Sequence, residues 1–146
     1  MLRKIQGLKC SYAENDLGAL RAIEARLAST ARAGTLIKYG NLVRGIDIRM
    51  ANVDDGRRFE LFQPDWSPLH SAILGDLLGY IACRSFERGG FLASAMAILA
   101  EGEPSDGFRK LAVQVGLLSP GNDVDALWAE HVRLSVAWYS KHDSVL

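Results

Sequence analysis

The stretch that decides the fold is residues 67–107, which read SPLHSAILGDLLGYIACRSFERGGFLASAMAILAEGEPSDG. Ser67 and Pro68 are typical of a helix start, because serine is a favoured N-cap and proline fits the first helical position. Apolar residues then recur every three or four positions, which is the period of a helix with a buried face. The pattern predicts a central helix that ends at the Gly89-Gly90 pair.

Two glycines, Gly75 and Gly79, lie inside this predicted helix, on a face that also carries Ala72 and Ala82. Glycine in a helix interior costs about 1 kcal/mol relative to alanine, so we expect a compensating gain elsewhere. The close approach of another backbone is such a gain. The glycines therefore predict a central helix that is buried on two sides.

The residues that follow the central helix predict a strand, a turn and a further helix. Residues 91–99 carry no charge and have turn residues on both sides, which is typical of a buried strand, although alanine is a poor strand former. Residues 103–107 (EPSDG) predict a turn, because proline presets φ and serine and aspartate bond the local backbone. Apolar residues at helical spacing then predict a short helix over residues 108–115.

The chain before the central helix predicts two helices and a hairpin. The first helix is amphipathic, is capped by Asn15 or Asp16, and ends at Gly34. A short second helix covers residues 36–43. Residues 46–50 and 58–62 alternate polar with apolar side chains, which predicts two strands joined as a β-hairpin.

After the short helix, Asp123 predicts the cap of a last helix, and the polar tail from Ser140 is expected to fray. These elements together predict an α+β fold in a single domain over residues 1–146. About five helices surround a small sheet made from the hairpin and the strand over 91–99, in a winged-helix-like order.

Composition narrows the class of protein. The 146 residues carry 17 basic and 17 acidic side chains, so no net charge draws the chain to nucleic acid or to a membrane surface. We find no signal peptide and no apolar run near the roughly 20 residues of a membrane span. Cys10 and Cys83 have no paired spacing, which indicates a reducing compartment and no structural zinc. We expect a cytoplasmic protein with no membrane contact.

The sequence shows no catalytic or metal-binding signature. The G-x-S-x-G pattern of hydrolases is missing. Of the three histidines, His131 lies on an apolar helical stripe, His142 lies in the tail, and His70 lies in the first turn of the central helix, so none is an obvious catalytic base. The acidic clusters at 54–55 and 101–106 lie in predicted turns, where solvated carboxylates are routine. We therefore expect no cofactor and no metal.

A basic and aromatic set is the candidate nucleic-acid surface. Arginine outnumbers lysine twelve to five, and arginine suits phosphate contacts. The alternative is that these arginines are a solvated face. The candidate nucleic-acid-binding residues are Tyr39, Arg44, Arg57, Arg58, Tyr80, Arg84 and Arg88, with Arg49 close by in sequence.

Two other hypotheses stay open. The protein can be an interaction module that binds a protein partner through the last helix, with Trp128 or Trp138 exposed. It can also be a small enzyme or ligand binder that uses Ser94, residues 101–105 and His70, and a deep pocket there would favour this.

Four segments resemble a loosely defined set of small uncharacterised bacterial domains. The set shares a Tyr segment, a Leu/Gly helix, a small-residue strand and a Pro-x-x-Gly-Phe turn. The resemblance covers slightly over half the chain and implies a fold rather than an activity. Its segments here are LIKYG (36–40), LGDLLGY (74–80), GGFLASA (89–95) and PSDGF (104–108).

Residues 35–43 are also similar to a Tyr-Gly helix in the DNA-binding half of alkyltransferase-like proteins. The methyl-accepting enzymes of that family have a Pro-Cys-His-Arg run in the strand, where this chain reads Ala-Ser-Ala-Met at 93–96. Residues 46–66 also depart from the family pattern. The likeness therefore implies binding without alkyl transfer.

The expected function is that of a non-catalytic macromolecule-binding or regulatory protein. Nucleic acid is slightly favoured over a protein partner as the ligand. A defence, mobile-element or toxin-immunity context fits such a protein.

Overall fold

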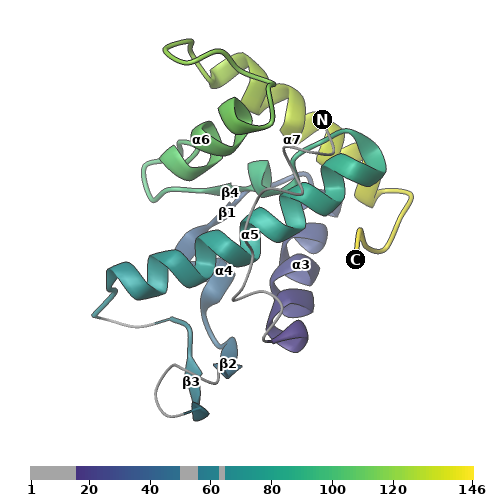
Figure 1. Cartoon of the computed structure of the whole chain (residues 1–146). Coiled ribbons are helices and arrows are strands. Elements are labelled where there is room, and N and C mark those ends of the chain that lie inside the picture. The colour runs from purple at the N-terminus through teal and green to yellow at the C-terminus, as the bar shows by residue number, and fades with distance from the viewer. Residues whose placement is uncertain (1–15, 50–55, 63–64) are drawn as a thin grey trace.

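Helix α5 (Pro68–Gly89) runs through the centre of the molecule, and the other elements pack around it (Figure 1). The computed structural model describes residues 16–49, 56–62 and 65–146. The α+β class with about five helices is confirmed. The other described elements are α3 (Leu17–Arg32), β1 (Ile37–Lys38), α4 (Tyr39–Val43), β2 (Asp47–Arg49), β3 (Arg58–Glu60), the 3₁₀ helix η2 (Ala93–Met96), β4 (Ala97–Ile98), α6 (Asp106–Gln114) and α7 (Asp125–Tyr139).

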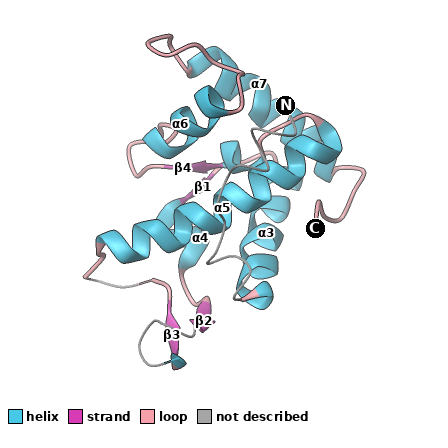
Figure 2. Ribbon diagram, viewed as in Figure 1, coloured by secondary structure: helices cyan, strands magenta, loops and turns pink. Residues whose placement is uncertain are grey.

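The strands form two separate two-stranded sheets rather than the single sheet that the sequence predicts (Figure 2). Strands β2 and β3 pair antiparallel, with Ile48 opposite Phe59, so the predicted hairpin is confirmed. Its loop, residues 50–55, lies outside the described residues. In the second sheet, β1 and β4 pair in parallel, with Ile37 opposite Ala97. This pair connects a segment that precedes α5 in the chain with one that follows it.

Both ends of α5 are fixed by the local chemistry that the sequence predicts. The Ser67 hydroxyl accepts a hydrogen bond from the backbone N–H of His70 at 3.4 Å. In return, Nδ1 of His70 accepts from the backbone N–H of Ser67 at 3.1 Å, which completes a capping box with histidine in the place of the usual Glu or Gln. At the other end, Gly90 has φ of 73°, the left-handed conformation that favours glycine.

The predicted strand over residues 91–99 is wrong, apart from Ala97 and Ile98. Residues 93–96 form the 3₁₀ helix instead. The reason lies in the backbone N–H groups, which donate to side chains and not to a neighbouring strand. The N–H of Leu92 donates to Nδ1 of His131 at 2.8 Å, and the N–H of Ala93 donates to the hydroxyl of Ser85 at 3.0 Å.

Ser85 is a fully buried junction between α5 and this segment. Besides accepting from Ala93, its hydroxyl lies 2.8 Å from the carbonyl oxygen of Ala82 and 2.7 Å from that of Phe91. The hydroxyl therefore satisfies polar backbone groups that have no strand partner. The hydrogen bonds to Phe91 and Ala93 hold the segment that follows α5 against the helix.

Three helix boundaries differ from the prediction. The short helix α4 starts at Tyr39 rather than at residue 36, because Ile37 and Lys38 are taken up by the parallel strand pair. Helix α6 starts at Asp106, capped by Ser105, whose hydroxyl accepts from the N–H of Phe108 at 3.2 Å. At α7 the N-cap position is Val124, one residue after the predicted cap.

The end of the chain is anchored, so the prediction of a frayed tail is wrong. Glu24 on α3 is only 3% exposed, and its carboxylate accepts from the Tyr139 hydroxyl at 2.8 Å and from the N–H of Val145 at 2.7 Å. The hydroxyl of Ser144 donates to the same carboxylate. Because Val145 is also fully buried, the tail packs against the core between α3 and α7. Sequence periodicity carries no sign of this contact, since its partners lie more than 100 residues apart.

Candidate functional site

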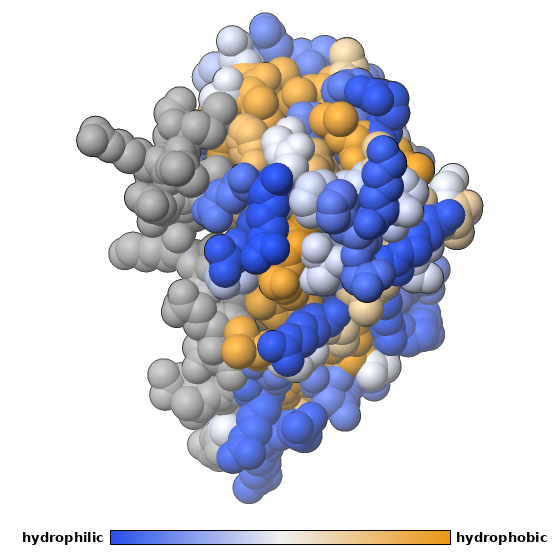
Figure 3. All heavy atoms as spheres, turned by 90° about the vertical axis from the view of Figure 1, so that its right-hand side faces the viewer, coloured by the Kyte–Doolittle hydropathy of each residue, from blue (hydrophilic) through white to orange (hydrophobic). Residues whose placement is uncertain are grey.

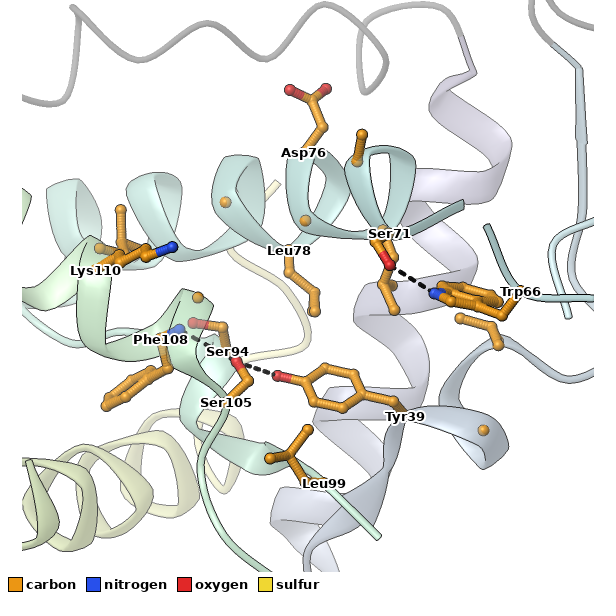
Figure 4. A pocket seen from close by; sticks show the side chains of 18 of the residues that line it. Tyr39, Trp66, Ser71, Asp76, Leu78, Ser94, Leu99, Ser105, Phe108 and Lys110 are labelled. Carbon is orange, nitrogen blue, oxygen red and sulfur yellow. Dashed lines mark hydrogen bonds between the residues drawn. The ribbon is translucent and has the colours of Figure 1, made fainter. Parts of the chain in front are cut away.

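A cavity of about 1010 Å³ opens beside the first half of α5 (Figure 4). Its walls come from α4, α5, α6 and the residues around η2 and β4. Most of the side chains are apolar. The larger ones are Val43, Phe62, Leu74, Leu78, Leu99, Phe108 and Leu111.

The two glycines of α5 line this cavity. A Cβ atom placed on Gly75 or on Gly79 would meet no other atom within 4 Å, so no neighbouring backbone approaches them in the described chain. The close approach of another backbone that the sequence predicts for these glycines is therefore not found among the described residues. Their lack of side chains instead leaves open space along one face of the helix.

The hydroxyl groups of Tyr39, Ser94 and Ser105 are polar groups in the cavity wall, as is that of Ser71 near the start of α5. The Tyr39 hydroxyl donates to the Ser105 hydroxyl oxygen at 2.8 Å, the same oxygen that caps α6. Burial raises the pKa of Tyr39 above its usual value of 10.0, so its phenol stays protonated at neutral pH. Ser94 is 6% exposed, and its hydroxyl oxygen has no hydrogen-bond partner among the described residues.

Charged groups stay at the edge of the cavity. Lys110 lines it, but the side chain is 77% exposed, and its ammonium group lies 3.1 Å from the carboxylate of Asp106. In Figure 4 the Asp76 side chain points away from Tyr39 and Ser105. Beside the start of α5, the indole N–H of Trp66 donates to the hydroxyl of Ser71 at 2.6 Å. The inner part of the cavity is therefore neutral.

The structure does not gather the predicted nucleic-acid-binding residues into one surface. Arg44, Arg57 and Arg58 lie at or beside the hairpin, where the Arg44 guanidinium stacks 4.6 Å from the Phe62 ring. Arg49 lies directly opposite Arg58 in the hairpin. Tyr39 belongs to the cavity.

The remaining predicted residues lie in the last turns of α5, and that helix spans roughly 33 Å at 1.5 Å per residue. Here Arg84 lies 3.6 Å from Glu87 and 5.7 Å from the ring centre of Tyr80. Arg88 is exposed in the final turn. The arginines thus form two groups, one near each end of the helix.

Both tryptophans of the predicted partner surface are half-buried. The Trp128 indole N–H donates to the carbonyl oxygen of Ala95 at 2.9 Å. Trp138 stacks on His142 with ring centres 3.8 Å apart, and its ring centre lies 5.6 Å from that of Phe91. Each ring therefore packs within the protein, and α7 presents neither as an open anchor.

The residues of the predicted enzyme site are separated by the fold. Ser94 and Ser105 line the cavity, whereas His70 completes the cap of α5 and does not line it. Glu101 and Glu103 are exposed in the turn before α6. His131 is buried at the η2 segment, where burial lowers the pKa of its ring. Among the described cavity-lining residues there is no histidine, and the one carboxylate, Asp76, points away from Ser105 (Figure 4).

The outer surface is mixed. Figure 3 shows the right-hand side of Figure 1, where hydrophilic residues cover much of the described surface and hydrophobic residues appear between them. None of the helices in the described ranges combines the length and the apolar character that a membrane crossing needs. Within the same ranges, no three His, Cys, Asp or Glu side chains are grouped to hold a metal ion.

In comparisons with known proteins, no family model, no curated protein and no solved structure matches the chain. The site must therefore be interpreted from its own geometry. The sequence left open a pocket near Ser94 and residues 101–105, but it did not connect those residues with Tyr39 or with the two α5 glycines. The one sequence signal was the spacing of small residues at 71, 75 and 79 on one helix face.

Proposed function

We propose that this chain is a non-catalytic binding or regulatory protein that takes a small, mainly apolar molecule into the cavity beside α5. The observation that supports this most is the open space in front of Gly75 and Gly79. Small-molecule sites are concave and mainly apolar, have a few polar groups, and typically measure about 300–1000 Å³. The cavity matches that description at its upper end.

Binding without catalysis is supported by the described cavity lining, which holds no histidine and whose one carboxylate, Asp76, points away from Ser105. A serine nucleophile needs a neighbouring base to take its proton. The Tyr39 phenol next to Ser105 is protonated and donates its own proton to that serine, so it cannot act as the base. Ser94 has no described partner of any kind.

The proposal is tested by titrating the purified protein with diphenylhexatriene, a hydrocarbon that fluoresces when it leaves water. We expect the wild type to bind it, and Gly75→Leu to weaken binding about tenfold or more, since a leucine side chain would take up apolar contact area worth roughly 1.5–3 kcal/mol. Ala129→Leu is the matched control, because it adds the same side chain to an exposed position on α7. We expect it to bind as the wild type does.

Two results would contradict the proposal. One is a wild-type protein that does not take up the hydrocarbon, and the other is equal binding by the wild type and Gly75→Leu. The nucleic-acid prediction is followed in parallel, by fluorescence anisotropy with a labelled random DNA duplex and an RNA of equal length at two salt concentrations. Salt-sensitive binding without hydrocarbon uptake would favour the arginines over the cavity.

A further inference from the structure

Ser94 is an unusual residue in the cavity, because a buried hydroxyl ordinarily has a hydrogen-bond partner. It is 94% buried, its oxygen has no partner among the described residues, and it lines the same space as Gly75 and Gly79. The other fully or nearly buried serines, Ser85 and Ser135, both bond to backbone carbonyl oxygens. Ser94 therefore holds an unused donor in the wall of a mainly apolar cavity.

Ser105 supplies a second available proton. Its oxygen accepts from the Tyr39 hydroxyl and from the N–H of Phe108, which uses its two lone pairs. Neither bond uses the proton of the Ser105 hydroxyl itself. Figure 4 shows Ser94, Ser105 and Tyr39 together on the side of the cavity across from α5. A ligand atom that accepts hydrogen bonds would complete this group.

The charged residues around the cavity determine whether a charged or a neutral acceptor is favoured there. Lys110 is the cation among the described residues that line the cavity, and it is largely exposed and paired with Asp106. A carboxylate placed beside Ser94 would lose its hydration without gaining a cationic partner, which is strongly unfavourable. A neutral carbonyl oxygen loses far less and can accept from hydroxyl donors.

We propose that the ligand is an elongated, uncharged molecule whose carbonyl oxygen, as in an ester, ketone or amide, accepts hydrogen bonds from Ser94 and Ser105. Its apolar part lies along the glycine face of α5. This inference rests on the proposed function and adds the ligand's polar group and its charge. Ser94 acts here as a binding and specificity-determining residue.

The test compares three probes of known chemistry: diphenylhexatriene, the polyene fatty acid parinaric acid, and its methyl ester. At pH 8 the acid is ionised and the ester is neutral, and their chains are the same. We expect the wild type to bind the ester at least about tenfold more tightly than the acid, because an unpaired buried charge is costly.

The variant Ser94→Ala should weaken ester binding about threefold to tenfold relative to hydrocarbon binding, which is the range for one neutral hydrogen bond. The substitution removes a hydroxyl without a partner, so the fold is expected to survive it. Ser135→Ala is the matched control: it removes another buried hydroxyl, but one that lies outside the cavity and bonds to the carbonyl oxygen of His131. It should leave the ratio of ester to hydrocarbon affinity unchanged.

The outcomes separate this inference from the proposed function. Hydrocarbon binding that Gly75→Leu removes, together with an ester preference that Ser94→Ala removes, supports both. Hydrocarbon binding with equal affinity for acid and ester, or with an ester affinity that Ser94→Ala does not change, overturns the inference alone. Failure of all three probes to bind overturns both.

Discussion

We predict that the hydrogen bond from Tyr139 to Glu24 stabilises the folded protein, and the substitution Tyr139→Phe tests this. Phenylalanine keeps the ring, which is fully buried against Phe91, and removes only the hydroxyl. That hydroxyl donates to the buried Glu24 carboxylate at 2.8 Å. A hydrogen bond to a charged group contributes about 1.5–3 kcal/mol. We expect the free energy of unfolding to fall by about 2 kcal/mol, which lowers Tm by roughly 4–8 °C for a chain of this size.

The same bond makes a prediction about pH. Burial raises the pKa of Tyr139 well above its usual value of 10.0, and the neighbouring Glu24 charge raises it further. The folded protein therefore holds the phenol proton more tightly than the unfolded chain does. The contribution of Tyr139 is complete below pH 10 and is lost as the pH rises above 10, by up to about 1.4 kcal/mol for each pH unit.

Urea unfolding at pH 7.5, 10 and 11 measures both effects. The wild type should lose stability above pH 10, and Tyr139→Phe should lose less over the same range. Some loss remains in the variant, because burial also raises the pKa of Tyr39. Tyr80→Phe is the control, since it removes a tyrosine hydroxyl from a half-buried position on α5; we expect the free energy of unfolding to change by no more than about 0.5 kcal/mol. Equal stability of the wild type and Tyr139→Phe at pH 7.5, or parallel losses above pH 10, would refute the reasoning.

Three further predictions concern helix α5. Gly75→Ala should stabilise the protein by up to about 1 kcal/mol, because alanine is the better helix former and nothing lies within 4 Å of its new methyl group. Gly89→Ala should destabilise it, since the methyl group would meet the rings of Phe91 and Trp138 at 2.8 Å; thermal unfolding of both variants checks the opposite signs. Ser85→Ala should cost about 1–3 kcal/mol in urea unfolding, because it leaves buried backbone groups without their partner. A loss below 0.5 kcal/mol would show that these groups find other partners.

The parts of the fold that the sequence predicts well are those with local causes. The central helix begins at Ser67 and ends at Gly90 because a cap and a left-handed glycine need only their immediate neighbours. The hairpin follows from the alternation of buried and exposed side chains around Ile48. In each case the residues that decide the structure lie within a few positions of one another.

The predictions that are wrong concern segments whose structure depends on residues far away in the sequence. Residues 91–96 read as a strand by composition, but His131, about forty residues further on, takes the N–H of Leu92. No periodicity in the segment itself contains that information. The same holds for Glu24, which fixes residues near the end of the chain.

The candidate site could be predicted only in fragments. The glycines at 75 and 79 indicate a helix face without side chains, but the sequence does not say whether a backbone covers it or the space stays open. Ser94 was a candidate residue, yet its value as an unused donor depends on its burial. The prediction that grouped it with His70 fails to foresee that the histidine belongs to the helix cap.

The parallel pair of β1 and β4 has a consequence for the order of folding. Its two strands are about sixty residues apart in the chain, and the whole of α5 lies between them. Closing so long a loop is entropically costly, whereas helices α3 and α5 can nucleate from neighbours in sequence. We expect the helices to form and collapse first and the strand pair to close late. Since β4 directly follows η2, the inner wall of the cavity would then be completed in one of the last steps of folding.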